Sequence, residues 1–245
     1  MRVDLNADVG EGVGDDAALM PFLSSANIAC GYHAGNAAVM RHAIAFARRH
    51  HVAVGAHPGF QDRKGFGRRE LTMTAAEVEG LISRQIHTLA EAATEKGVRV
   101  THVKPHGALY NMAARDAGLA AAIARSVAAV DRTLMLFGLA GSNLIDEGRK
   151  AGLRTVSEVF ADRAYRPDGS LVPRTEPGAV LDDTDLVVRR ALAMVREDAV
   201  PAVDGTRVPL EVETICIHGD TPGAVEFARR LRAALDAAGV EVIAP

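Results

Sequence analysis

The chain has 245 residues, 48% of them hydrophobic and 24% charged, with a formal net charge of −3 at pH 7. This is the composition of a globular protein with a sizeable core, and no basic arm points to nucleic acid. The 4% aromatic content and the absence of Trp also argue against a base-stacking platform. The two cysteines predict no disulfide framework, and the sequence shows neither a signal-peptide pattern nor an apolar run of membrane-spanning length, so we expect a cytoplasmic protein.

Short apolar segments alternate along the chain with longer segments of helical periodicity. Strands are expected at about 2–5, 26–30, 52–56, 98–104, 134–138, 154–160, 213–217 and 240–243, and helices at about 36–50, 74–96, 116–130, 142–151, 182–198 and 222–237. This order predicts parallel strands joined by crossover helices. We therefore expect a single α/β barrel domain over residues 1–245, with a doubly wound open sheet as the alternative.

The first expected strand ends in polar residues. Asp4, Asn6 and Asp8 alternate along it and so share one face, and Glu11 follows in the next loop. The active site of an α/β barrel lies at the carboxyl ends of its strands. Because buried polar groups need partners, these side chains indicate a ligand, a metal or a polar network there, unless they form a solvated edge.

Polar or reactive residues also lie at the ends of the second and third expected strands. Cys30 is expected to be a small buried residue, while Asn36 can cap the next helix or contact a ligand. His57 ends the third strand. The basic loop 63–69 after it could hold an anionic substrate or could simply be solvated.

The fourth strand places His102, Lys104 and His106 on one face. Lys104 could bind a carboxylate or phosphate there as a point charge. In the sixth strand Glu158 is followed by Arg163, which could contact substrate or form a structural ion pair. The segment 161–181, rich in Pro, Gly, Asp and Arg, is expected to be a long functional loop.

The seventh strand places Cys216, His218 and Asp220 on one face, where His218 and Asp220 could act as a base and its orienting group. The sequence contains no phosphate-binding GxxxxGK[ST] loop, no HExxH and no GxSxG motif. The residues alone therefore indicate general acid–base hydrolysis or a metal-activated water, and they do not identify the substrate.

Several long runs, NIACGYHAG, HVKPHGALYN and EVFADRAY, resemble the LamB/YcsF family, which contains the A component of the bacterial ATP-dependent 5-oxoprolinase. The resemblance extends over essentially the whole chain. It implies a distorted barrel of about seven parallel strands, similar to the glycoside hydrolase/deacetylase group. It also implies ATP-driven opening of 5-oxoproline to L-glutamate, with partner subunits B and C, and ATP as a co-substrate that those partners could bind. One departure is Asn36, where the family often has Asp.

On this hypothesis the candidate residues fall into two groups. The catalytic candidates are Asp8, Glu11, Lys104 and His106. The substrate-binding candidates are Asn6, His33, His57, Arg68, Glu158, Arg163, His218 and Asp220. Asp8 or Glu11 would act on water, and Lys104 with the histidines would stabilise negative charge or hold a phosphate.

Two other functions fit the same residues. One is a stand-alone metal-dependent amide hydrolase or deacetylase, with Asp8, His33 and His57 as conceivable ligands of a divalent metal. The other is a non-catalytic subunit that captures the small acid and presents it to partners.

Overall fold

Seven parallel strands form a closed barrel in the computed structural model, which describes residues 1–218 and 223–245 except for the side chain of His218. The barrel strands are β1 (Arg2–Val9), β2 (Ser25–Ala29), β3 (Ala53–His57), β4 (Val100–Val103), β5 (Met135–Leu139), β6 (Thr155–Phe160) and β9 (Thr214–His218). They are hydrogen-bonded in that order, and pairing of β9 with β1 closes the barrel. The short strand β10 (Glu241–Val242) pairs with the start of β1. The predicted barrel is confirmed, and the open-sheet alternative is wrong.

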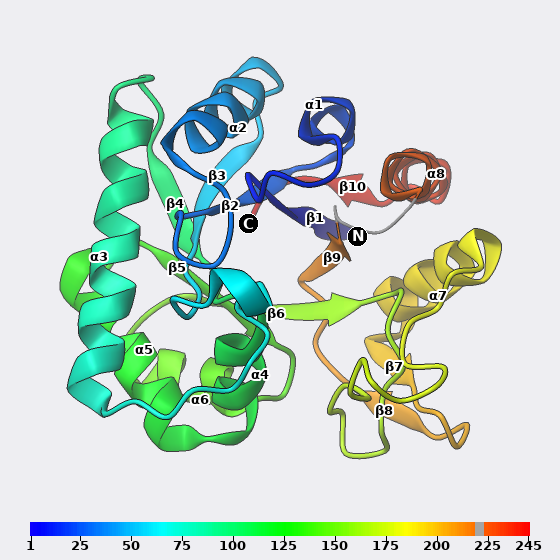
Figure 1. The fold of residues 1–245 in the computed structure, drawn as a ribbon. Helices are drawn as coiled ribbons and strands as arrows, with labels where there is room; N and C mark the ends of the chain where they lie inside the picture. The colour runs from blue at the N-terminus through cyan, green and yellow to red at the C-terminus, as the bar shows by residue number, and fades with distance from the viewer. Residues whose placement is uncertain (219–222) are drawn as a thin grey trace.

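Helices surround the barrel on the outside (Figure 1). They are α1 (Asp16–Leu19), α2 (Ala37–Arg49), α3 (Ala75–Thr94), α4 (Gly107–Arg115), α5 (Ala117–Val130), α6 (Asn143–Lys150), α7 (Thr184–Glu197) and α8 (Ala224–Ala237), with short 3-10 turns η1 (Met20–Phe22) and η2 (Arg63–Gly65). Apolar residues on their inner faces pack against the outward faces of the strands and form the core. None of the described helices combines the length and apolar character that crossing a membrane would require.

Two predicted helix starts have the expected caps. The Asn36 side chain accepts hydrogen bonds from the backbone N–H groups of Ala38 and Val39, at 2.9 and 3.1 Å. Thr74 and Glu77 form a reciprocal capping box at the start of α3. Asn36 therefore acts as a helix cap in this structure, a role for which an amide serves as well as a carboxylate.

The segment 161–181 contains no helix and no named strand, as predicted. It is held by isolated antiparallel bridges, Arg163 to Val180 and Tyr165 to Leu171. Two nearby features were not expected from the sequence: helix α4, and a small antiparallel hairpin of β7 (Ala199–Pro201) and β8 (Arg207–Pro209). In Figure 1 this hairpin lies beside the 161–181 loop and away from the barrel strands.

Candidate active site

The deepest polar layer of the barrel surrounds Asp4. Its carboxylate accepts hydrogen bonds from the hydroxyls of Ser24, Ser25 and Thr214, at 2.6, 2.8 and 2.6 Å. Burial raises the pKa of Asp4 to about 6, although the three hydroxyl donors work in the opposite direction. The Asp4 carboxylate therefore finds its hydrogen-bond partners within this layer, and the layer supports the residues above it.

Asn6 occupies the next layer, where both the nitrogen and the oxygen of its side-chain amide form hydrogen bonds. Its Nδ2 donates to Glu158 Oε1 at 2.9 Å and to Thr214 Oγ1 at 2.7 Å. Its Oδ1 accepts from Asn27 Nδ2 at 2.7 Å and from Lys104 Nζ at 3.1 Å. Asn6 therefore fixes the positions of a carboxylate and an ammonium group that arrive from different strands.

Lys104 is a buried cation between two carboxylates. Its Nζ lies 3.0 Å from Asp8 Oδ1 and 2.7 Å from Glu158 Oε1, and 2.9 Å from Cys216 Sγ. Burial alone would lower the pKa of Lys104, but the neighbouring Asp8 and Glu158 carboxylates raise it well above its usual value. Lys104 is therefore a fixed positive charge. Of its two carboxylate partners, Asp8 is the one that lines the cavity.

Two imidazole rings meet beside Asp8. His57 Nδ1 lies 2.7 Å from the carbonyl oxygen of Lys104, and His106 Nε2 lies 2.8 Å from the carbonyl oxygen of Phe66. The other nitrogens, His57 Nε2 and His106 Nδ1, are 2.9 Å apart. His57 Nε2 is also 3.3 Å from Asp8 Oδ2. Backbone carbonyls thus orient both rings and aim one nitrogen of each at the other.

A third imidazole and a second carboxylate complete this cluster. Glu11 Oε1 lies 3.3 Å from His33 Nε2 and 3.4 Å from His106 Nδ1. The His33 ring stacks on the His106 ring, with centroids 3.9 Å apart and planes 6° from parallel. One donor atom from each of Glu11, His33, His57 and His106 lies within 4.8 Å of the other three, so the cluster could hold a metal ion.

Glycines make this crowding possible. A Cβ on Gly67, whose φ is +65°, would lie 2.8 Å from His33 Cβ and 2.9 Å from His106 Cδ2. A Cβ on Gly59 would lie 2.7 Å from His33 Nδ1. Any other residue at these positions would push the stacked rings apart.

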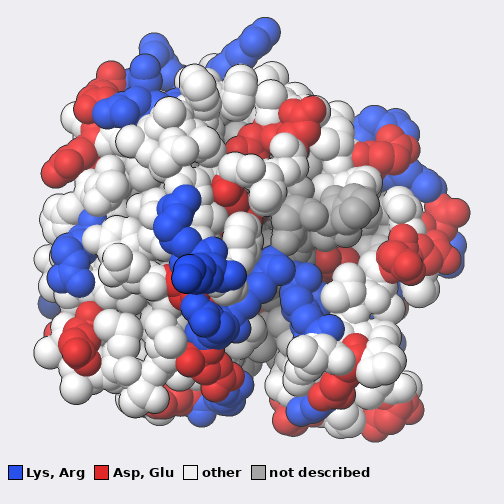
Figure 2. Space-filling model, in the orientation of Figure 1, with Lys and Arg blue, Asp and Glu red and all other residues white. Residues whose placement is uncertain are grey.

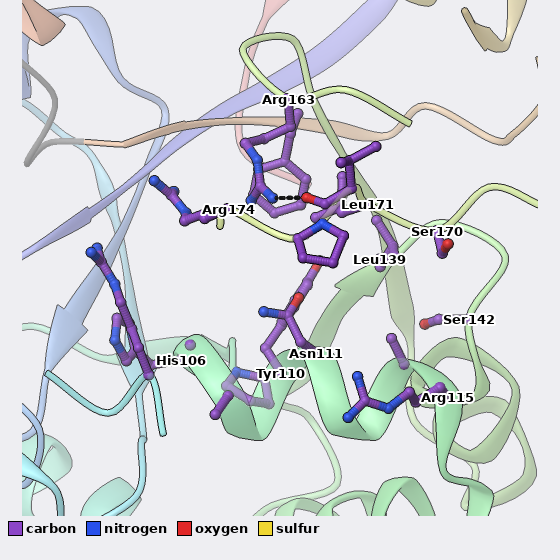
Figure 3. Close-up of a pocket in the computed structure, with 18 of the residues that line it drawn as sticks. His106, Tyr110, Asn111, Arg115, Leu139, Ser142, Arg163, Ser170, Leu171 and Arg174 are labelled. Carbon is purple, nitrogen blue, oxygen red and sulfur yellow. Dashed lines mark hydrogen bonds between the residues drawn. The ribbon is translucent and has the colours of Figure 1, made fainter. Parts of the chain in front are cut away.

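A cavity of about 810 Å³ opens above these groups. Figure 3 shows its two walls. Tyr110, Asn111 and Arg115 of α4, with His106 just before this helix, form one wall, and Arg163, Leu171 and Arg174 face them from the 161–181 loop. Arg163 is buried, and its guanidinium donates to the carbonyl oxygens of Ala179 and Val172 at 3.2 and 2.6 Å. Arg163 therefore holds the loop in shape while it contributes to the cavity wall.

The cavity wall is rich in arginine. The residues are Arg68, Arg115, Arg163, Arg166 and Arg174. Arg115 pairs with Glu70 at 2.5 Å and Arg166 with Glu176 at 2.8 Å. Burial, with the neighbouring Arg174, lowers the pKa of Arg163 to about 10, so it remains charged at neutral pH. Figure 2 shows Lys and Arg side chains gathered near the middle of this face. The surroundings suit an anionic ligand.

The structure separates the sequence-predicted site residues into three groups. Those that line the cavity are Asp8, Glu11, His57, Arg68, Lys104, His106 and Arg163. Those that are buried behind the cavity wall and hold the first group in place are Asn6, His33 and Glu158. The side chain of His218 and the whole of Asp220 lie outside the described residues.

Sequence reasoning missed two kinds of contributor. Asn27 and Tyr110 are buried partners, since Asn27 Nδ2 donates to Asp8 Oδ1 at 2.9 Å and Tyr110 donates to Glu158 Oε2 at 2.7 Å. The parity of Asn27 within its apolar strand could have revealed it. The other contributors are Arg115 of α4 and Arg166 and Arg174 of the 161–181 loop. They carried no periodic signal, and only the unusual composition of the loop pointed to the last two.

The LamB/YcsF family model matches residues 3–245 of this chain. A solved structure of a lactam utilization protein from Thermus thermophilus is 48% identical, covers 100% of both chains and has a TM-score of 0.95. A putative cellobiose-phosphate cleavage protein from Enterococcus faecalis is 13% identical, with a TM-score of 0.60 over 98% of this chain and 96% of that one. A family 4 carbohydrate esterase from Streptomyces lividans is 15% identical, with a TM-score of 0.50 over 98% and 91%. The last two share the fold alone, which agrees with the expected likeness to the deacetylase group.

Proposed function

Since this chain belongs to the LamB/YcsF family, we propose that it is the lactam-opening subunit of an ATP-dependent 5-oxoprolinase that works with partner subunits B and C. Two findings support the proposal: the full-length similarity to a protein described as acting in lactam utilization, and a cavity lined by both buried acid–base groups and several arginines. The proposal rests mainly on the cavity, because lactam opening needs the acid–base groups and a phosphorylated intermediate needs the cations.

A five-membered lactam is a stable amide that water attacks slowly. Transfer of the γ-phosphoryl group of ATP to the lactam oxygen would make the ring carbon more electrophilic. Water would then add to that carbon and the C–N bond would break, with a proton passing to the nitrogen. A second water molecule would release inorganic phosphate and leave L-glutamate.

Asp8 is the best-placed base for the attacking water. It lines the cavity, and its Oδ1 is held by Lys104 and Asn27 at 3.0 and 2.9 Å, which fixes the direction of Oδ2. The buried ammonium group of Lys104 lies beside it and would stabilise negative charge that develops on the oxygen attached to the lactam carbonyl carbon. Glu11 and His106 lie at the same end of the cavity and would serve proton transfer to the leaving nitrogen.

The size and charge of the cavity fit a substrate larger than the lactam. A volume of about 810 Å³ lies near the upper end of ordinary ligand pockets and far exceeds the needs of a nine-atom lactam. Arg68, Arg163 and Arg174 would bind the phosphoryl group or the substrate carboxylate. ATP itself would be bound by the partner subunits, in keeping with the absence of a phosphate-binding GxxxxGK[ST] loop from this sequence.

The test is an assay of glutamate and ADP formation from 5-oxoproline with this protein alone, subunits B and C alone, and all three together. We expect glutamate only from the complete mixture. Asp8→Asn should abolish glutamate formation without unfolding the protein, and Arg174→Ala should raise KM about tenfold or more by removing a charge-assisted contact. Arg48→Ala, an exposed arginine on α2, is the matched control. Normal glutamate formation by Asp8→Asn would overturn this assignment of the site.

The four-residue cluster of Glu11, His33, His57 and His106 favours a second candidate, a metal-dependent amide hydrolase that needs no partner. The same assay separates the two. Amide hydrolysis by this chain alone, without ATP and sensitive to chelators, would support the second candidate and refute the first.

A further inference from the structure

We propose that Glu11, His57 and His106, completed by His33, bind one divalent transition-metal ion of the zinc type at the inner end of the cavity. The inference rests on the geometry of these four residues and does not depend on the lactam chemistry proposed above.

Two of the distances between donor atoms match the spacing of ligands around a metal ion, whereas the facing nitrogens of His57 and His106 are closer, at 2.9 Å, and all four donor atoms lie within 4.8 Å of one another, so binding an ion requires small shifts of the side chains. Ligands bonded at 2.0–2.1 Å to a tetrahedral ion lie about 3.3 Å from one another. The Glu11 oxygen lies 3.3 Å from His33 Nε2 and 3.4 Å from His106 Nδ1. Three imidazole nitrogens and one carboxylate oxygen are a donor set that suits Zn²⁺ and Co²⁺ more than Mg²⁺ or Ca²⁺.

In neutral rings, the hydrogen bonds to the backbone leave the inner nitrogens without hydrogens. A carbonyl oxygen only accepts, so His57 Nδ1 and His106 Nε2 carry the ring hydrogens that they donate to Lys104 and Phe66. The lone pairs of His57 Nε2 and His106 Nδ1 then face each other across 2.9 Å. Two neutral acceptors at that distance repel, and a cation between them removes the repulsion. Outer nitrogens fixed by carbonyl oxygens are also typical of histidines that bind metal.

His33 supplies independent support. Its Nδ1 is buried and has no hydrogen-bond partner among the described residues. If the ring hydrogen is on Nδ1, the Nε2 lone pair faces the Glu11 carboxylate; if it is on Nε2, a bare Nδ1 is buried. Either arrangement leaves a buried polar atom unsatisfied. An ion on Nε2 removes the contact between that lone pair and the carboxylate, and the ring hydrogen then stays on Nδ1.

The orientation of the imidazole rings indicates which residues bind the ion most strongly. The His33 and His106 rings are nearly parallel, so an ion in the plane of one ring lies outside the plane of the other. The ring of His106 is tied to a carbonyl, whereas Nδ1 of His33 is not tied to any described residue, and His33 is therefore the ring that turns. We expect Glu11, His57 and His106 to be the principal ligands and His33 to strengthen binding.

The site is open to the cavity. Glu11, His57 and His106 line it, as does Asp8, whose Oδ2 lies 3.3 Å from His57 Nε2 and adds negative charge near the ion. A bound divalent ion at this place would polarise a carbonyl or phosphoryl oxygen of the substrate.

The experiment measures metal binding by the untagged, chelator-treated full chain, by titration calorimetry with Zn²⁺, elemental analysis, and the visible absorption of Co²⁺. We expect one ion per chain, a rise in melting temperature on adding Zn²⁺, and a Co²⁺ spectrum of low coordination number. His106→Ala and Glu11→Gln should weaken binding about 100-fold or more, and His33→Ala should weaken it less. His87→Ala, an exposed histidine on α3, should bind normally.

The inference is wrong if the wild-type chain takes up no ion, or if Glu11→Gln and His106→Ala bind Zn²⁺ as His87→Ala does. Glu11→Gln keeps the size and shape of the side chain, so it remains informative if His106→Ala does not fold. In the absence of metal binding, a shared proton between the two facing rings would explain the cluster. Loss of lactam-opening activity has no bearing on either result.

Discussion

Replacement of the buried lysine is the sharpest test of the barrel interior. In Lys104→Met the flexible apolar chain fills the space of the lysine stem, but Asp8 and Glu158 lose the ammonium group at 3.0 and 2.7 Å. Removing one member of a buried ion pair costs about 3–5 kcal/mol, because the charge left behind stays desolvated. For a chain of this length that corresponds to a fall in melting temperature of about 6–10 °C.

The assay is urea unfolding of wild type and variant at two pH values. Without the lysine, burial favours the protonated form of the carboxyl group left behind in the folded chain, whereas the unfolded chain releases that proton at a lower pH. The variant is then most stable at low pH and loses stability as pH rises, so its deficit should be larger at about pH 8 than at about pH 5. Adding Glu158→Gln should restore part of the loss, since it removes a buried charge that no longer has a partner.

Lys150→Met provides the control, because this lysine pairs with Glu147 at 2.6 Å but its side chain is 70% exposed. Exposed pairs of this kind contribute less than about 1 kcal/mol. A deficit in Lys104→Met that is no larger than the control and does not change with pH would refute the view that the lysine is a charged group held between two buried carboxylates.

Three further outcomes are expected. Since burial raises the pKa of Asp4 to about 6, its contribution to stability is lost as pH rises from about 4 to about 6, and unfolding titrations of Asp4→Asn should lack that component of the pH slope. Gly67→Ala should cost more than Gly97→Ala in urea unfolding: both glycines have φ of +65°, but only at Gly67 does a Cβ meet side chains, so equal losses would contradict a steric role. Thr74→Ala should lower stability by about 1 kcal/mol through loss of the capping box, whereas Ser142→Ala, at a helix start with no side-chain cap bond, should change it much less; a similar loss in both would refute the capping argument.

The barrel could be predicted because each of its elements carries a local signal. Short apolar runs, helical stripes and a capping box such as that of Thr74 and Glu77 mark the alternation of strand and helix, and alternation along β1 places Asp4, Asn6 and Asp8 on one face. Barrel closure brings that face against Lys104, directly after β4, and Glu158 from β6. Since both faces of such strands are buried, polar residues on the inner face have to meet one another.

The sequence could not show how those inner residues share their hydrogen bonds. Glu158 and Asn6 were expected to contact substrate, yet both lie behind the cavity wall. Asn6 precedes Asp8 on the same face of β1, and Glu158 is paired in register with Thr214, which is itself paired with Asp4 below Asp8. Helix α4 was missed because HGALYN follows Pro105 directly and starts without a side-chain cap. The cavity wall that it forms with residues 161–181 depends on long-range packing that no local pattern encodes.

The residues proposed to bind a metal show the same limit of sequence analysis. Asp8, His33 and His57 were the conceivable ligands from sequence, whereas the structure groups Glu11 and His106 with the two histidines and places Asp8 beside His57, paired with Lys104. A carboxylate paired with a buried ammonium group attracts a metal ion less strongly than one that faces imidazole nitrogens. Because of this pairing, the two groups of residues suit different tasks. The Lys104–Asp8 pair is suited to acting on water, and the cluster of Glu11 with the imidazoles is suited to holding a cation. Because His57 touches both groups, with Nε2 at 3.3 Å from Asp8 and 2.9 Å from His106, occupancy of the cluster and the basicity of Asp8 should be coupled.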